Sequence, residues 1–180
     1  MKRKNFIRSA LMVMPALSFG GKSKYKRQEA ISGGQLKKGF VVRAGESRYN
    51  GRQAAPKDAF LHCKISSADT DGHFLIQTST PRLFKMKGGP PPHVHAYEDE
   101  IIYVVSGSFM VQIDGEDQLL KAGDTAFIPR GTMHTVTNPM DDNPGCLITI
   151  FQPAPKKVEA FFSYISEHGS IPENIIPDGW

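Results

Sequence analysis

The stretch GGPPPHVHAYEDEIIYVVSG, residues 88–107, decides the fold of this chain. Its three consecutive prolines hold φ near about −65° and drive each preceding residue toward extended geometry, so no helix can run into His93. Residues i and i+2 share a face only where the backbone is extended. We therefore expect His93 and His95 to project their imidazoles from one side of an extended segment.

Glu100 begins the strand that follows the two histidines. On a strand it shares a face with Ile102 and Val104, whereas the residues between them face the other way and are also apolar. A strand that is apolar on both faces predicts that its outer face is covered, by another strand or by a second subunit. A carboxylate at the start of such a strand needs a partner that neutralises it.

A second segment, GDTAFIPRGTMHTVTN over residues 123–138, contains a further histidine. His134 begins a short strand on which Val136 shares its side. Three histidines and one carboxylate that project from strands suit a divalent transition metal: iron, manganese, nickel, cobalt or zinc. In octahedral coordination, these four residues would leave two positions for water, dioxygen or a bidentate substrate.

The remainder of the chain favours β structure. Short apolar runs separated by turn residues extend from Gly39 to Gln152, which predicts an antiparallel sandwich or barrel over residues 39–153. A helix and a tail are expected over residues 154–180. The helix has an amphipathic pattern that ends at Gly169, and its aromatic side is interpreted as a packing face. That pattern consists of Val158, Phe161, Phe162 and Ile165.

The first 20 residues have a basic start and a short apolar stretch, the pattern of an export signal. The segment resembles a twin-arginine signal in which Lys4 replaces one arginine. Residues 21–38 are expected to form a polar linker or arm. We expect a periplasmic protein without a stable membrane anchor; the alternative is a cytoplasmic protein with a basic tail. The four basic residues among the first 20 account for the net charge of +4, so the charge does not indicate nucleic-acid binding.

The two motifs resemble those of the cupins, a superfamily of small β-barrels. The first reads His93-x-His95, four residues, Glu100, six residues and Gly107. The second contains Gly123, Pro129, Gly131, His134 and Asn138 at the spacing of the family. The resemblance implies a double-stranded β-helix jelly-roll barrel, a metal bound by His93, His95, Glu100 and His134, and a homodimer.

Within the cupins, the chain resembles single-domain proteins that are similar to quercetin dioxygenases. The first hypothesis is a metal-dependent dioxygenase with a small chelating substrate such as an enol, catechol or flavonol. Glu100 would serve as metal ligand and as base, and Ile102, Val104 and Val136 would line an apolar pocket. The alternatives are a metal-dependent isomerase or epimerase, or a non-catalytic protein that binds a small molecule.

Other polar residues are interpreted more plainly. Cys63 and Cys146 lie in apolar, strand-like contexts, so two separate thiols are favoured over a disulfide. His62, His73 and His168 are interpreted as surface or cap residues. Tyr97, Glu98 and Asp99 are interpreted as rim residues, with the alternative that one of them serves as an acid or base beside the metal ligands.

Overall fold

The structure is a computed structural model that describes residues 38–56, 59–80, 87–143, 145–175 and 177. The expected export signal lies outside these residues, as does the linker except for Lys38. Among the described residues, no helix has the length and apolar character that crossing a membrane requires.

Short strands separated by turns make up most of the described chain. They are β1 (Ser47–Tyr49), β2 (Arg52–Ala54), β3 (Leu61–Ile65), β4 (Leu75–Ser79), β5 (His93–Val94), β6 (Asp99–Ser106), β7 (Ser108–Ile113), β8 (Glu116–Lys121), β9 (Thr125–Ile128), β10 (Met133–Thr137) and β11 (Cys146–Gln152). A 3₁₀ turn (Ser67–Asp69) and helix α2 (Lys156–His168) complete the described elements.

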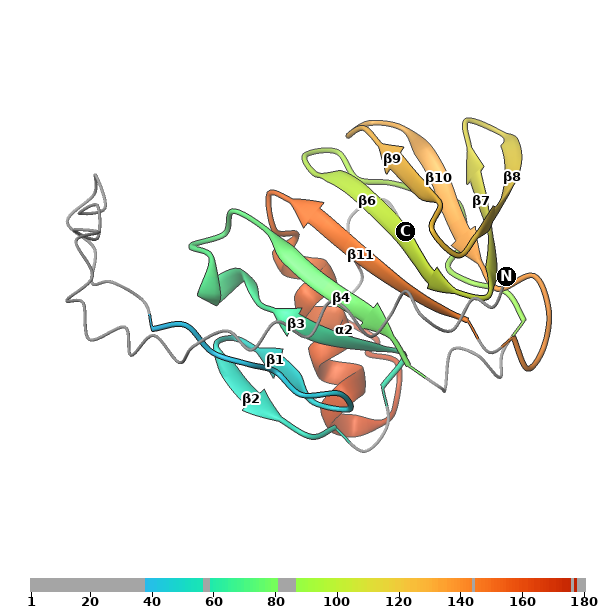
Figure 1. Cartoon of the computed structure of the whole chain (residues 1–180). Coiled ribbons are helices and arrows are strands. Elements are labelled where there is room, and N and C mark those ends of the chain that lie inside the picture. Colours follow the sequence, from blue (N-terminus) through green and yellow to red (C-terminus); the bar gives the residue numbers. More distant parts are fainter. Residues whose placement is uncertain (1–37, 57–58, 81–86, 144, 176, 178–180) are drawn as a thin grey trace, which may run out of the picture. The chain divides into compact units, whose positions relative to one another are not determined.

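The strands form two main antiparallel sheets (Figure 1). One sheet has the order β3-β4-β11-β6-β9, the other has the order β5-β10-β7-β8, and β1 pairs with β2 separately. The predicted all-β jelly-roll barrel with a short C-terminal helix is confirmed. Neighbours such as β5 and β10 are far apart in sequence, which is how two distant motifs can reach one site.

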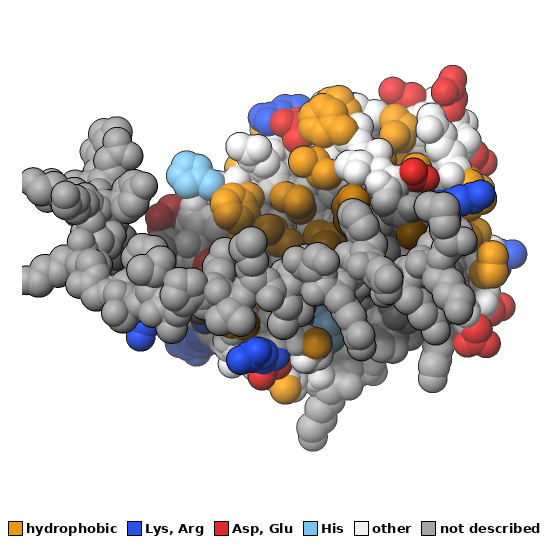
Figure 2. Space-filling view, viewed as in Figure 1, with side chains coloured by type: hydrophobic (Ala, Val, Ile, Leu, Met, Phe, Trp, Pro, Cys, Tyr) orange, Lys and Arg blue, Asp and Glu red, His pale blue; other side chains and the backbone are white. Residues whose placement is uncertain are grey.

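Strand β6 alternates as its sequence predicts. Glu100, Ile102 and Val104 are buried, and the last two belong to the hydrophobic core between the sheets. On the outer face, Tyr103 is 41% exposed and Val105 is 46% exposed. Figure 2 shows hydrophobic side chains gathered over this part of the sheet. The expected cover for this face is therefore not provided by the described residues.

Gly107 of the first motif stands where the backbone leaves no room for a side chain. Gly107 joins β6 to β7 with φ +75°, and a Cβ there would collide with the Cα of Gly145. Gly88 exchanges two backbone hydrogen bonds with Asn138, of 3.0 and 2.8 Å. This bridge ties the segment that precedes His93 to the end of the second motif.

Helix α2 packs against the sandwich through its apolar side. Val158 joins a core cluster with Leu75 of β4 and Phe151 of β11. The helix ends at Gly169, which adopts the left-handed conformation with φ 71°, as the sequence predicts. Buried Glu159 anchors the helix because its carboxylate accepts hydrogen bonds from the backbone N–H groups of Asn50 (3.2 Å) and Ser67 (2.9 Å).

Candidate metal centre

Strand pairing places two of the histidines side by side. His93 of β5 is the direct cross-strand partner of His134 of β10. Directly opposed residues in an antiparallel pair have Cβ atoms about 5 Å apart, and the two imidazole centroids lie 4.5 Å apart. The first and second motifs therefore meet across a single pair of strands.

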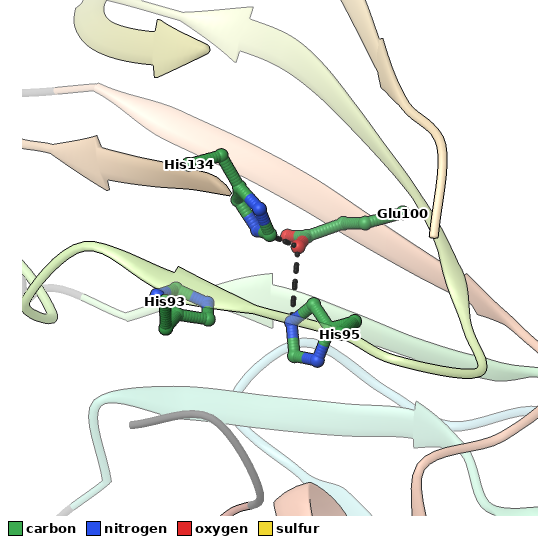
Figure 3. Close-up of side chains that lie close together, drawn as sticks. All are labelled: His93, His95, Glu100 and His134. Atoms are coloured by element: carbon green, nitrogen blue, oxygen red, sulfur yellow. Dashed lines mark hydrogen bonds and ion pairs between the residues drawn. The ribbon is translucent and has the colours of Figure 1, made fainter. Parts of the chain in front are cut away.

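His95 and Glu100 complete the cluster from the loop after β5 and from β6. The carbonyl of His95 accepts the backbone N–H of Gly131 at 2.8 Å, and its ring packs edge-on against Phe151 at 5.1 Å. The Oε2 atom of Glu100 lies 3.3 Å from Nε2 of His95 and 2.9 Å from Nε2 of His134 (Figure 3). The carboxylate belongs to the five-stranded sheet, so the cluster spans both sheets.

All four expected side chains meet in the interior. One nitrogen or oxygen atom from each of His93, His95, Glu100 and His134 lies within 4.8 Å of the corresponding atoms of the others. The four residues are between 1% and 5% exposed. A small buried set of imidazoles and one carboxylate is what a divalent transition metal requires.

The hydrogen bonds of the ring nitrogens show that this donor set fits a cation. The Nδ1 atom of His93 lies 2.8 Å from the Pro91 carbonyl, and Nδ1 of His134 lies 2.9 Å from the Thr132 carbonyl. A carbonyl only accepts, so each Nδ1 carries the proton and each neutral Nε2 presents a lone pair. The lone pair of His134 thus faces the Glu100 carboxylate, a repulsive contact unless a proton or a metal ion neutralises it.

In the metal-free cluster, burial and hydrogen bonds between the side chains determine which groups are ionised. Burial raises the pKa of Glu100, but hydrogen bonds from His134 and His95 outweigh it and bring the pKa to about 2. For His134, burial lowers the pKa, yet the hydrogen bond to Glu100 leaves it raised above its ordinary value. Burial lowers the pKa of His93 to about 4, so this imidazole is neutral at pH 7.

A cavity of about 690 Å³ adjoins the cluster. His93, His95 and Glu100 lie on its wall, which is otherwise mainly apolar. Of the three expected pocket residues, Val136 lines this cavity. Ile102 and Val104 are not among the described lining residues. They are 0% exposed, because β6 carries them away from Glu100 into the core around Phe109, Val111 and Leu147.

Several lining residues were not predicted from sequence. Phe161 and Phe162 of α2 line the cavity, so the aromatic side of this helix is a cavity wall as well as a packing face. Gln77 of β4 also lines it. In the sequence, strand alternation puts Gln77 on the same face as Leu75, and this face is the buried one. The more apolar Ile76 faces the other way.

The histidines and acidic residues that we expected at the surface or rim, and the two cysteines, lie outside the cluster. His73 and His168 are exposed, and His62 is half-buried with its Nδ1 atom 3.0 Å from the Ser47 hydroxyl. Cys63 and Cys146 are both free. At the rim, Asp99 at the start of β6 forms an ion pair with Arg130 at 2.8 Å, which joins the segments that carry the two motifs.

Comparisons with known proteins agree with the two motifs. A sequence model of the cupin domain matches residues 83–151. The pectin degradation protein KdgF of Dickeya dadantii is 45% identical over 47 residues, 26% of this chain and 43% of that protein. An uncharacterized protein of Aquifex aeolicus is 36% identical over 91 residues, 51% of this chain and 67% of that protein.

A solved structure gives a weaker likeness. KdgF from a Halomonas species is 29% identical, covers 52% of this chain and 79% of that chain, and has a TM-score of 0.43. The match to the Dickeya protein spans less than half of that protein's length.

Proposed function

The chain belongs to the cupin superfamily, and we propose that it is a mononuclear metalloenzyme, most simply a non-haem dioxygenase with a small chelating substrate. His93, His95, Glu100 and His134 would hold one divalent ion per chain. The observation that carries the proposal is the convergence of these four buried side chains beside a cavity. When bound, iron or manganese would supply Lewis acidity and one-electron chemistry with dioxygen.

Glu100 is the residue that we assign to proton transfer. Among the described residues that line the cavity, it provides the one carboxylate. Its lowered pKa keeps it ionised at neutral pH, so it would accept a proton only from a substrate hydroxyl whose own pKa a bound metal lowers. The N–H group of His134 that faces the Thr132 carbonyl keeps the opposite edge of that ring turned toward the carboxylate.

The remaining cavity residues bind the substrate and exclude water. Phe109, Phe151, Phe161 and Phe162 provide aromatic surface, which favours a flat or ring-containing molecule. At about 690 Å³, the cavity has the volume of a typical small-molecule site. This apolar wall favours an aromatic enol or catechol over a highly hydroxylated sugar.

A metal-dependent isomerase is the second candidate. It is supported by the 45% identity over 47 residues to a pectin degradation protein, since sugar-derived carbonyl compounds are substrates for such proton shifts. The same Glu100 carboxylate would then move a proton between neighbouring carbons without consuming oxygen.

Oxygen consumption separates the two candidates. Protein reconstituted with Fe(II) is incubated with flavonols, catechols, β-diketones and sugars released from pectin, and both oxygen uptake and substrate loss are followed. The dioxygenase proposal predicts uptake that matches substrate loss and stops without oxygen. Substrate loss that continues without oxygen would favour the isomerase. Binding without loss of any compound would leave a non-catalytic binding protein.

A further inference from the structure

Gln77 carries an amide for which the fold supplies no partner. The residue is 0% exposed, and neither its Nε2 nor its Oε1 atom has a hydrogen-bond partner among the residues that the structure describes. Buried side-chain amides are nearly always paired, because leaving them unpaired destabilises the folded state. No other buried side chain of the described residues shows this feature.

The position of Gln77 relates this amide to the cavity. It lies on the inner face of β4, between its cross-strand partners Cys63 of β3 and Thr149 of β11. Gln77 and Thr149 both line the cavity that adjoins the metal-ligand cluster. Both flanking side chains are neutral, since burial raises the pKa of the Cys63 thiol. The amide therefore adjoins a cavity wall without charge on either side.

Sheet geometry gives the separation between Gln77 and the cluster. Strand β11 lies between β4 and β6, with Phe151 opposite both Leu75 and Glu100. Neighbouring strands are about 4.8 Å apart, and Gln77 is two residues beyond Leu75, so the backbones of Gln77 and Glu100 are about 10 to 12 Å apart. Two fused or linked rings span such a distance.

We propose that Gln77 is a specificity-determining residue, which binds a neutral hydroxyl or carbonyl group at the end of the substrate remote from the metal-ligand cluster. The inference rests on the proposed function, since it takes the cluster as the site for the chelating end. The ligand class is a two-ring compound with vicinal oxygens at one end and a neutral polar group at the other. A neutral amide between neutral neighbours offers two N–H donors and a carbonyl acceptor to such a group. Because Gln77 is fully buried, its side chain must rotate or the cavity wall must shift when the ligand binds.

The first test measures the metal-free protein. Gln77→Met keeps the length of the side chain and removes the unpaired amide, so we expect the melting temperature to rise by about 3 to 8 °C. Gln118→Met makes the same chemical change at an exposed position of β8, where we expect a shift of less than about 2 °C. A lower melting temperature in Gln77→Met would overturn the proposal, because the amide would then be paired in the ligand-free protein.

The second test uses two ligands that differ in one hydroxyl. Calorimetric titration of zinc-loaded protein compares 4-phenylcatechol with 4-(4-hydroxyphenyl)catechol, without turnover. We expect the wild type to bind the hydroxylated compound more tightly, and Gln77→Met to lose roughly tenfold in affinity for that compound alone. An equal loss for both compounds would show that Gln77 only shapes the wall, which would overturn the proposal.

Metal content separates this inference from the proposed function. Gln77→Met should retain the same zinc content as the wild type, since its side chain is not one of the four converging ligands. If the wild type binds zinc but neither catechol, the proposed ligand class is wrong while the metal centre stands. If the wild type binds no zinc, the proposed function itself fails.

Discussion

Removal of the Glu159 carboxylate should loosen the helical wall of the cavity. This buried side chain accepts backbone hydrogen bonds from Asn50 and Ser67, one on each carboxylate oxygen. Hydrogen bonds to a charged group contribute about 1.5 to 3 kcal/mol each. Asn50 is exposed, so water replaces part of that loss. We expect Glu159→Ala to lower the free energy of unfolding by about 2 to 4 kcal/mol.

Chemical denaturation followed by circular dichroism measures this change. Glu167→Ala is the matched control, because Glu167 is an exposed carboxylate on the same helix and its removal should cost less than about 0.5 kcal/mol. Because a loss of 1 kcal/mol lowers the melting temperature of a protein of this size by a few degrees, Glu159→Ala should melt about 5 to 15 °C lower than the wild type. Equal denaturation midpoints for the two variants would refute the assignment of Glu159 as the anchor of α2.

Three further predictions concern the metal site, the outer face of the sheet and the motif glycine. Metal affinity should fall as the pH falls through the raised pKa of His134, and again near pH 4, where His93 protonates. Calorimetry in buffers of different ionisation enthalpy should detect that metal binding releases more protons at about pH 6 than at about pH 9. We propose that two copies pair through the outer face of β6 and β9, where Phe127 is exposed. Phe127→Glu should then yield monomers in ultracentrifugation, whereas Leu119→Glu on β8 should not. A monomeric wild type at micromolar concentration would exclude this pairing. Gly107→Ala should destabilise the fold by more than the roughly 1 to 3 kcal/mol of backbone strain that an alanine in the left-handed conformation causes. Gly115→Ala, whose Cβ would meet no neighbouring atom, should show only this backbone strain. Equal midpoints of urea unfolding for the two variants would contradict the collision with Gly145.

The metal-ligand cluster was accessible from sequence because local rules determine it. The prolines force an extended backbone before His93, and the i, i+2 spacing then places His95 on the same side. Alternation along β6 separately places Glu100 on the buried face. The structure adds the cross-strand pairing of His93 with His134, which depends on contacts between segments about 40 residues apart in sequence. The resemblance to the family implied that the two motifs share one site, whereas the direct pairing of their strands was not predicted.

The cavity was less predictable, because its wall comes from strands that carry no motif. Gln77 lies on the buried face of β4 although Ile76 beside it is more apolar, so hydropathy alone would reverse the strand. Ile102 and Val104 have the expected orientation but lie too deep in the core to line the cavity. The aromatic side of α2 looked like ordinary packing, and only the tertiary structure shows that Phe161 and Phe162 border open space.

The metal site is tested most directly by the metal content of purified protein after equilibrium dialysis against a divalent transition metal. We expect about one equivalent per chain for the wild type and for His73→Ala, which alters an exposed histidine. We expect far less than one equivalent for His134→Ala, with the folded state retained. One full equivalent in His134→Ala would contradict the claim that these four side chains bind one ion.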